Sequence, residues 1–580
     1  MRDLPPRSDD LATLLARAAV FARAGVVFVD RHENEVALDY VEVHRRARAA
    51  AAHLKSIGVR RSDRVAIVLP TGPEFLDAFF GCQLLGAVPV PLYPPVRLGR
   101  LDEYVERTAA LVRIAECVAV IADRRTRRLL GEVVALARPP LGTIGAEALA
   151  LHPVDPTERI TGPRDAPRPD DLALVQFSSG TTRTPAAVAL THRQVLANVE
   201  SITESLPDRA LAEDGGCVCW LPLYHDMGLV GCVLATIRCG RKLVLLPPEA
   251  FLAKPALWLR AIARHRATVS TAPDFAYARC LEKVRDEELE GMSLASWQVA
   301  MNGAEPVAPR TLRAFHDRFA RFGLGAQALT PVYGLSEATL AVTFSDPAEP
   351  FRATAFDRDA LSEGTVRATA GGLELVSLGR PLRGFEVRIR DDARADLAED
   401  RVGRVWVRGP SVMSGYLGDA PSPLHEGWLD TGDVGFVHEG DLYVCGRAKD
   451  VVVVRGRNHA PHDIERACDG IDGVRTGCTV AVSEIDSDGE RLLVFVELRE
   501  GAKDVDPRAV ERRCREEIVG RTGLDPARIV LLSAGTLPRT SSGKLRRGET
   551  LRRWIRRELE PARAVTPVFL ASALARSVFG

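Results

Sequence analysis

The sequence predicts an α/β protein with a large N-terminal domain and a smaller α+β C-terminal domain. Three observations lead to this prediction. Continuous apolar runs alternate with amphipathic stretches through about residue 380, which indicates buried strands, expected to be parallel, separated by helices. Short alternating strands with Gly and Asp turns follow from Gly379, which favours a small antiparallel region. The length of 580 residues exceeds what one hydrophobic core ordinarily supports.

The elements of the large domain follow from local patterns. Strands are expected over residues 64–70, 118–123, 172–177, 242–247 and 267–273, and a helix over residues 73–87. Residues 385–390, 403–409 and 440–447 supply the short strands of the antiparallel region. Residues 347–372 are mixed polar and Gly-rich, so we interpret them as an insertion loop.

The domain boundary is expected near Lys449, which divides the chain into residues 1–447 and 448–580. The smaller domain should contain strands over residues 451–456, 479–485, 491–500 and 528–533, and a helix over residues 506–519. This mixture of strands and one helix predicts a compact α+β unit.

Composition excludes several classes of protein. With 77 basic and 77 acidic residues the formal net charge is zero, which argues against a nucleic-acid-binding protein. The eleven cysteines form no Cys-x-x-Cys pair and no metal-binding spacing, so we expect reduced thiols. The first ten residues lack the apolar segment of a signal peptide, and the longest uncharged apolar run is about half a membrane span. We therefore expect a cytoplasmic protein with no stable membrane insertion.

A loop rich in hydroxyl groups follows the strand expected at residues 172–177. A glycine turn with many N–H and O–H donors suits phosphate oxygens, although a plain polar turn is the alternative interpretation. No G-x-x-x-x-G-K-[ST] motif occurs here, so the loop is not a Walker A loop. A helix should begin after it, because Thr191 and Gln194 match a capping box. The candidate phosphate ligands are Ser178, Ser179, Gly180, Thr181 and Thr182.

Lysine is rare in this chain, since only seven of the 77 basic residues are lysines. One of them, Lys544, lies in the segment PRTSSGKLRR at residues 538–547. A lysine presents a compact ammonium on a flexible stem, whereas an arginine spreads its charge over a planar fork. We therefore expect Lys544 to serve a place where negative charges converge, the alternative being an exposed loop lysine.

Seven motifs occur in order along the chain. They are SSGTTRTPA (178–186), WLPLYHDMGL (220–229), NGAEPV (302–307), YGLSEAT (333–339), DTGDVG (430–435), GRAKD (446–450) and PRTSSGK (538–544). The series resembles that of the adenylate-forming ligase superfamily over roughly residues 11–551. Within this superfamily, RTPAAV, YHDMGL, NGAEPV, GRNHAPHDIE and the insertion at 347–372 are most similar to the fatty acyl-AMP ligases.

The resemblance implies a fold and a reaction. The large domain would consist of two layered α/β subdomains and a small distorted β-barrel, with a mobile C-terminal domain. ATP and Mg²⁺ would be the cofactors, and a fatty acid would be converted to acyl-AMP with release of pyrophosphate. The acyl group would then pass to the phosphopantetheine thiol of a separate acyl carrier protein or polyketide synthase carrier domain. In the fatty acyl-AMP ligases the insertion restrains the C-terminal domain and is associated with failure to use coenzyme A.

The resemblance also implies roles for individual residues. Lys544 would act between the attacking carboxylate and the α-phosphate, and Glu337 would bind Mg²⁺ with Thr181. His225 would lie where the acyl tunnel meets the nucleotide, without acting as a base, because a carboxylate is already ionised at neutral pH. Tyr333 would stack on adenine, and Asp433 would accept both ribose hydroxyls. The remaining expected nucleotide-binding residues are Asn302, Gly303, Ala304, Gly334, Ser336, Arg447 and Lys449, the last of which also marks the hinge.

Two other functions remain open. One is a long-chain fatty acyl-CoA synthetase, against which the insertion and the RTPAAV segment argue. The other is a non-catalytic scaffold that binds acyl chains or carrier proteins, against which the intact Lys544, Glu337, Asp433 and Arg447 argue. Apolar residues near His225, namely Trp220, Met227, Leu229 and Val230, suggest an acyl pocket. Departures from the family pattern, such as Ala186 and Ala187 after Pro185, remove no charge that the chemistry requires.

Overall fold

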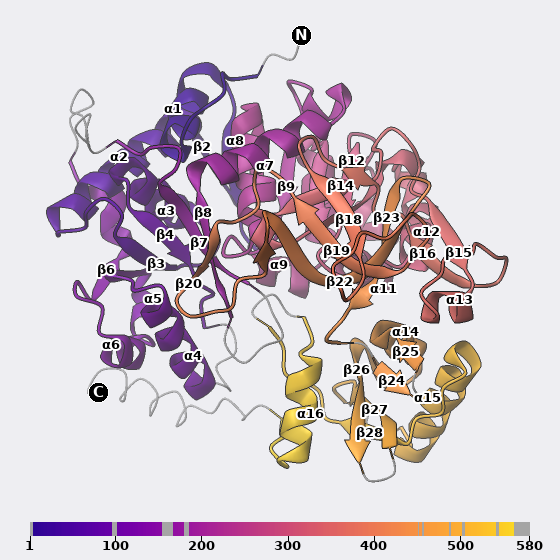
Figure 1. Cartoon of the computed structure of the whole chain (residues 1–580). Helices are drawn as coiled ribbons and strands as arrows, with labels where there is room; N and C mark the ends of the chain where they lie inside the picture. Colours follow the sequence, from indigo (N-terminus) through magenta and orange to yellow (C-terminus); the bar gives the residue numbers. More distant parts are fainter. Residues whose placement is uncertain are drawn as a thin grey trace.

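The computed structural model describes residues 4–95, 101–153, 166–178, 185–450, 452–454, 457–486, 489–501, 505–540 and 544–561. Figure 1 shows a large α/β part and, beneath it, a smaller part formed by the chain after Asp450. The α/β class expected from the sequence is confirmed. The division into residues 1–447 and 448–580 stays a prediction.

The largest sheet has nine strands in the order β17-β14-β13-β12-β11-β9-β10-β1-β2. Its six inner strands from β13 to β1 run parallel, and the strands at both edges are antiparallel to their neighbours. Two expected strands, at residues 242–247 and 267–273, are confirmed as β10 and β11. The strands are β1 (Gly25–Val29), β2 (Glu35–Asp39), β9 (Gly216–Cys219), β10 (Lys242–Leu245), β11 (Val269–Ala272), β12 (Val299–Asn302), β13 (Leu329–Gly334), β14 (Ala341–Phe344) and β17 (Arg380–Pro381).

Helices pack on this sheet around a core of fully buried aromatic residues that includes Trp258, Trp297 and Phe315. The capping box expected at Thr191 and Gln194 is present at the start of α7. The helices are α1 (Leu11–Phe21), α7 (His192–Ser205), the π-helix η4 (Met227–Leu234), α8 (Ala235–Cys239), α9 (Pro248–Ala253), α10 (Ala256–His265), α11 (Asp274–Lys283) and α12 (Pro309–Phe319).

A second sheet has four parallel strands in the order β4-β3-β5-β6. Its largely buried strands β3 and β5 confirm the expected strands at residues 64–70 and 118–123, and α3 confirms the expected helix. The elements are β3 (Arg64–Val68), β4 (Val88–Pro91), β5 (Ala119–Ala122), β6 (Thr143–Gly145), α2 (Tyr40–Ser56), α3 (Pro73–Leu85), α4 (Leu101–Ile114), α5 (Arg124–Arg127) and α6 (Gly131–Ala137).

The strand at residues 172–177 is confirmed as β7 (Leu172–Phe177), but its expected parallel pairing is wrong. It forms an antiparallel pair with β8 (Ala187–Thr191), which also pairs with β20 (Gly415–Leu417). Only nine residues connect β7 to β8, and a parallel connection needs a crossover of about a dozen or more. The loop expected to hold phosphate is therefore the connection of a β-hairpin.

The antiparallel region expected after Gly379 is confirmed as a five-stranded sheet with the order β18-β19-β22-β21, in which β23 also pairs with β22. Its strands are β18 (Glu386–Arg390), β19 (Gly403–Arg408), β21 (Leu424–His425), β22 (Trp428–His438) and β23 (Asp441–Arg447). The last of these strands leads directly to the expected hinge.

Residues 347–372 were expected to form a loop, but they contain regular structure. Strand β15 (Ala353–Phe356) pairs antiparallel with β16 (Leu373–Val376), and α13 (Arg358–Ser362) follows β15. The cause is an apolar anchor, since the fully buried Phe356 contacts the rings of Phe436 and Tyr443 on β22 and β23. The mixed polar composition of residues 347–372 gave no sign of this order, because the order depends on one buried side chain.

The smaller part contains a three-stranded sheet with the order β26-β27-β28 and a β24-β25 hairpin. Two apolar clusters lie on it, one formed with α14 and α15 and the other with α16. The α+β composition and the expected helix at residues 506–519 are confirmed. The elements are β24 (Val452–Val454), β25 (Arg457–His459), α14 (Pro461–Ala467), β26 (Val474–Asp486), β27 (Gly489–Leu498), α15 (Pro507–Thr522), β28 (Arg528–Leu532) and α16 (Arg547–Ile555).

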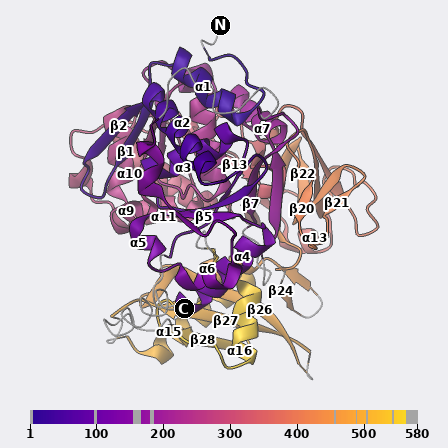
Figure 2. The same ribbon diagram turned by 90° about the vertical axis from the view of Figure 1, so that its left-hand side faces the viewer.

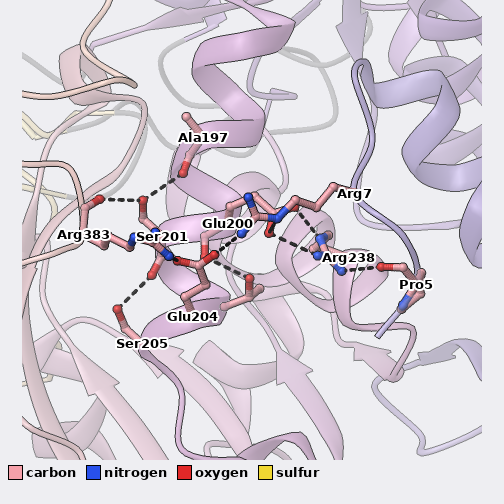
Figure 3. A network of polar contacts seen from close by, with 10 residues as sticks. Pro5, Arg7, Ala197, Glu200, Ser201, Glu204, Ser205, Arg238 and Arg383 are labelled. Atoms are coloured by element: carbon pink, nitrogen blue, oxygen red, sulfur yellow. Dashed lines mark hydrogen bonds and ion pairs between the residues drawn. The ribbon is translucent and has the colours of Figure 1, made fainter. Parts of the chain in front are cut away.

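The N-terminal segment is held by a polar network on α7 and α8 (Figure 3). Nε of the buried Arg238 donates to Oε1 of Glu200 at 2.5 Å, and its Nη1 donates to the carbonyl of Pro5 at 2.9 Å. Arg7 forms ion pairs with Glu200 and Glu204. A buried guanidinium requires such partners, so the network ties residues 5–7 to the core. No helix among the described residues is long and apolar enough to cross a lipid bilayer.

Candidate active site

A cavity of about 1800 Å³ lies between the large sheet and the smaller part of the chain. Residues that follow the carboxyl ends of β9, β11, β12 and β13 line one side, and residues 537–540 and 544–547 line the other. Ligands of α/β proteins collect at this end of parallel strands. Ten of the expected site residues line it: Ser178, His225, Ala304, Tyr333, Gly334, Ser336, Glu337, Asp433, Arg447 and Lys544.

Lys544 is held by a tight backbone pairing. The amide of Thr540 donates to the carbonyl of Lys544 at 2.8 Å, and the amide of Lys544 donates to Oγ1 of Thr540 at 3.0 Å. Burial lowers the pKa of the Lys544 ammonium and the charge of Arg447 lowers it further, whereas Asp226, Glu305 and Asp433 oppose this effect. The ammonium therefore lies among groups from four separate motifs and is not an exposed loop lysine.

His225 and Asp226 form a pair at the start of the π-helix η4. Nδ1 of His225 lies 2.5 Å from Oδ1 of Asp226, and Ser336 donates to Oδ2 of Asp226 at 2.5 Å. Burial would raise the pKa of Asp226, but His225, Ser336 and Lys544 hold it at about 2. Asp226 also accepts a hydrogen bond from the amide of Met227, so it caps η4. A π-helical turn is rare in proteins and is frequent at functional sites.

Asp433 lies on β22 directly opposite Arg447 on β23. Its Oδ2 accepts a hydrogen bond from the Tyr333 hydroxyl at 2.7 Å, and its Oδ1 lies 3.2 Å from Nε of Arg447. Burial raises the pKa of the Tyr333 phenol, and the charge of Asp433 raises it further. The structure thus brings together two residues expected to contact the two ends of a nucleoside.

Glu337 is the expected Mg²⁺ ligand. Its Oε1 accepts a hydrogen bond of 2.9 Å from the Tyr416 hydroxyl, and burial raises its pKa while Tyr416 and Arg447 act against this. Among the described residues no group of three or more His, Cys, Asp or Glu could hold a metal ion. Mg²⁺ in nucleotide sites commonly uses one or two carboxylates with phosphate oxygens and water, so a single half-buried Glu337 fits this cation. Thr181 lies outside the described residues.

The segment Asn302–Gly303–Ala304 follows β12. Nδ2 of Asn302 donates to Oδ1 of Asp274 at 3.0 Å, and neither Asn302 nor Gly303 lines the cavity, whereas Ala304 does. A Cβ at Gly303 would lie 2.7 Å from the carbonyl oxygen of Val332, so only glycine allows β12 and β13 to approach here. Asn302 therefore supports the wall of the cavity by fixing Asp274.

The hydroxyl loop is described only at its ends. The amide of Ser178 donates to the carbonyl of Ala186 at 2.9 Å, and the amide of Ala186 donates to Oγ of Ser178 at 3.3 Å. Ser178 and Pro185 line the cavity. The other expected ligands, Ser179, Gly180, Thr181 and Thr182, lie outside the described residues.

The expected hinge residue Lys449 is exposed and does not line the cavity. Its neighbour Asp450 accepts a hydrogen bond of 3.1 Å from Arg547, which also forms two hydrogen bonds of 2.7 Å with Glu465. Burial lowers the pKa of Arg547, but the carboxylates of Glu465 and Asp450 outweigh this effect, so its pKa is raised. The loop that carries Lys544 is thereby fastened to the hinge segment.

Of the four apolar residues expected at an acyl pocket, two line the cavity. Trp220 and Met227 line the cavity, and Trp220 stacks on Phe251 with ring centroids 3.9 Å apart. Leu229 and Val230, however, are fully buried and do not line it. The reason is η4, which turns these two side chains into the core.

Sequence reasoning missed several residues of the cavity wall. Asp274 is buried and Glu305 is half-buried, and both line the cavity. Burial raises the pKa of each, and the charge of Lys544 acts against this at Glu305. Glu305 accepts a hydrogen bond of 2.7 Å from the amide of Phe275. Its place inside the NGAEPV motif was an available signal, whereas nothing in the sequence marked Asp274 or Tyr416.

The comparisons with known proteins agree with this geometry. The model of the family described as AMP-binding enzyme matches residues 16–417, and the chain belongs to that family. Its relatives include a Caulobacter vibrioides protein named as a candidate acyl-CoA synthetase, 34% identical over 94% of this chain and 96% of its own. The Mycobacterium marinum long-chain-fatty-acid–AMP ligase FadD26 is 34% identical, with 89% and 91% covered.

Two further matches place the chain within the family. The medium-chain-fatty-acid–[acyl-carrier-protein] ligase JamA of Moorena producens is 33% identical over 91% of each chain. A solved structure from a study of fatty acyl-adenylate ligases of E. coli and L. pneumophila has a TM-score of 0.87 and 34% identity, covering 96% of this chain and 99% of that one. The adenylate-forming fold is therefore confirmed, and the chain groups with the fatty acyl-AMP ligases of its family.

Proposed function

We propose that this enzyme uses ATP to activate a fatty acid as acyl-AMP, releases pyrophosphate, and transfers the acyl group to a carrier-protein thiol. The observation that carries the proposal is the position of the Lys544 ammonium in the cavity, close to Asp226, Asp433 and Arg447. Relatives named as fatty-acid–AMP and fatty-acid–carrier-protein ligases support the choice of substrates.

In the first half-reaction a carboxylate oxygen forms a bond to the α-phosphorus of ATP, and pyrophosphate leaves with the electron pair of the broken bond. Lys544 would lie between the two converging anions and stabilise the charge of the transition state. Asp433 and Arg447 would hold the ribose, and Tyr333 the adenine. Glu337 would bind Mg²⁺, which supplies neutralisation of phosphate charge when bound.

In the second half-reaction the sulfur of a phosphopantetheine thiol forms a bond to the acyl carbon. The thiol loses its proton to solvent, and AMP leaves with the electron pair of the broken C–O bond. His225 is held by Asp226 and lines the cavity. It would lie where the acyl tunnel meets the nucleotide and orient the acyl group.

The insertion supports carrier transfer over coenzyme A. Arg358 on α13 lies 3.7 Å from Asp463 on α14, so the insertion contacts the smaller part directly. Such a contact opposes the rotation that family members undergo between half-reactions. An acyl-CoA synthetase is the second candidate function, because one relative carries that name.

ATP–pyrophosphate exchange with a panel of fatty acids tests the first half-reaction, and exchange above background is expected. Incubation of acyl-AMP with holo-carrier protein or with coenzyme A then separates the two acceptors. Carrier acylation without appreciable acyl-CoA supports the proposal, whereas efficient acyl-CoA formation favours the synthetase. A complete lack of exchange with every fatty acid would support a scaffold.

A further inference from the structure

Helix α4 of the large part and helix α16 of the smaller part lie next to one another (Figure 2). Residues of both helices line the cavity. Arg553 on α16 forms two hydrogen bonds with Glu103 on α4, of 3.0 and 3.2 Å. A bidentate pair of this kind fixes the relative position of its two helices. It therefore determines which other side chains of the two helices face one another.

Two arginines occupy the neighbouring positions. Arg107 follows Glu103 by four residues on α4, and Arg546 is the N-cap residue of α16, seven residues before Arg553. Residues four or seven apart share a helix face. Both arginines line the cavity, and Arg546 is 8% exposed. Burial lowers the pKa of Arg546, and the charge of Arg107 contributes most after burial, which agrees with their proximity.

Within the part of the chain that the structure describes, no ion pair balances the positive charge of Arg107. No carboxylate of the described residues lies within 4.0 Å of its guanidinium, and its buried Nε has no hydrogen-bond partner there. Its recorded neighbour is the ring of Tyr93, whose centroid lies 5.8 Å away. By contrast, Arg553 is neutralised by Glu103 and Glu549. Two arginines that share a buried space, one of them without a counter-ion, suit a ligand with negative charge.

The location of the pair indicates which anion it meets. Tyr93 packs in the same apolar cluster as Phe177, the residue before Ser178 and the hydroxyl loop. Its ring also lies 6.3 Å from that of Tyr224, which precedes His225. Arg546 follows Lys544 by two residues, and both residues line the cavity. Arg107 and Arg546 thus lie between Lys544 and the side of the cavity where the hydroxyl loop begins at Ser178.

We propose that Arg107 and Arg546 form a clamp that binds the terminal phosphates of ATP and holds pyrophosphate as it leaves; this inference rests on the proposed function. The bond between the α-phosphorus and the bridging oxygen breaks, and its electron pair remains on that oxygen, which belongs to pyrophosphate. No proton is transferred. The two guanidiniums neutralise the added charge, and the clamp is complete only when α16 lies against α4.

A phosphate group could also reach this place as the phosphodiester of phosphopantetheine in the second half-reaction. Both ligands are phosphate anions, but Lys544 faces the cavity in the same arrangement that brings Arg546 to Arg107. Since Lys544 acts in the first half-reaction, pyrophosphate is the ligand that coincides with the assembled clamp.

The test uses the full-length variants Arg107→Met, Arg546→Met and the double variant. Arg113→Met is the control, because Arg113 lies on α4 outside the cavity and its side chain donates to the carbonyl of Leu136. Titration of magnesium pyrophosphate by calorimetry gives binding directly, and ATP–pyrophosphate exchange gives KM for pyrophosphate. Each single clamp variant should raise Kd and KM for pyrophosphate about 10-fold or more, the scale of one lost charged hydrogen bond. Arg107→Lys should recover part of this loss, and thermal unfolding identifies any variant that fails to fold.

A separate arm measures single-turnover transfer from preformed acyl-AMP to holo-carrier protein. Unchanged transfer in the Met variants, together with weakened pyrophosphate binding, supports the clamp. Slower transfer with normal pyrophosphate binding overturns it in favour of the phosphopantetheine phosphodiester. Unchanged values in both arms overturn it as well. Because wild-type exchange with fatty acids reports on the proposed function alone, the two failures are distinguishable.

Discussion

The hydroxyl of Tyr333 donates a hydrogen bond to Asp433, although the two residues are 100 positions apart and lie on different sheets. Asp433 is 6% exposed and also lies within ion-pair distance of Arg447. A buried carboxylate held from two sides keeps its orientation before any ligand arrives. The proposed ribose-binding group is therefore preorganised.

Asp433→Asn retains the size of the side chain but removes its charge and one strong acceptor. We expect KM for ATP to rise about 10- to 100-fold, because a hydrogen bond to a charged group is lost. Tyr333→Phe removes only the supporting hydroxyl, so a rise of about 2- to 10-fold is expected. ATP-dependent exchange kinetics measure both values. An unchanged KM in Asp433→Asn would remove this residue from the nucleotide site.

Lys544→Ala should reduce acyl-AMP formation by about 10² or more, the scale of one lost transition-state donor. The effect should be absent from transfer of preformed acyl-AMP, because the lysine is assigned to the first half-reaction only. Mass spectrometry of the adenylate and a carrier-acylation assay measure the two steps. Wild-type rates of exchange in Lys544→Ala would contradict the assignment.

The pH dependence of adenylation should also report on Lys544. Burial and Arg447 lower its pKa, so the ammonium is lost at a lower pH than in an exposed lysine. Because the charged form is required, kcat/KM for ATP should fall as pH rises through this lowered pKa. Lys544→Arg keeps its charge throughout, so the alkaline decline should disappear from its residual activity. A decline at the same pH in both enzymes would point to another group.

The sequence predicted the elements whose patterns are local. Buried strands such as β3, β10 and β11 are continuous apolar runs, and the capping box of α7 is determined by two residues in one turn. Pairing depends on distant partners, which is why the direction of β7 was wrong. The order inside residues 347–372 depends on Phe356 meeting β22 and β23, a contact that no local pattern reveals.

The candidate site shows the same difference. Motifs identified Lys544, His225, Tyr333 and Asp433, and the structure brings all four to one cavity. They did not identify Arg107 or Asp274, because both residues reach the cavity only through tertiary packing. Helix α4 brings Arg107 towards Arg546, and β12 brings Asn302 to Asp274. Family motifs thus identify the residues expected to contact the reacting atoms, whereas the residues around them are recognised only from the three-dimensional structure.

Two glycines offer a matched test of the backbone. A Cβ at Gly334 would lie 1.8 Å from the carbonyl oxygen of Leu340, and this backbone atom cannot move without breaking the β13–β14 pair. Gly334→Ala should therefore lower the free energy of unfolding by about 2 kcal/mol or more.

Gly520 lies within α15 and a Cβ there would meet nothing within 4 Å. Gly520→Ala should raise the free energy of unfolding by about 0.5–1 kcal/mol. Denaturant unfolding measures both, and equal effects would refute the steric argument.

The contact between the insertion and the smaller part should control the choice of acceptor. Burial raises the pKa of Asp463, and the charge of Arg358 acts against this. Arg358→Glu would place two carboxylates together, and like charges repel. We expect the smaller part to move more freely, so that limited proteolysis near residues 447–450 becomes faster and acyl-CoA formation increases.

Phe356→Ala should have the same effect through a different route, because truncation of a buried phenylalanine costs about 3–5 kcal/mol and loosens the anchor. Arg367→Glu is the control, since Arg367 also lies in the insertion but pairs with Asp357 of the insertion itself. If both loosening variants left proteolysis and acyl-CoA formation at wild-type levels, the insertion would have no part in restraining the smaller part of this enzyme.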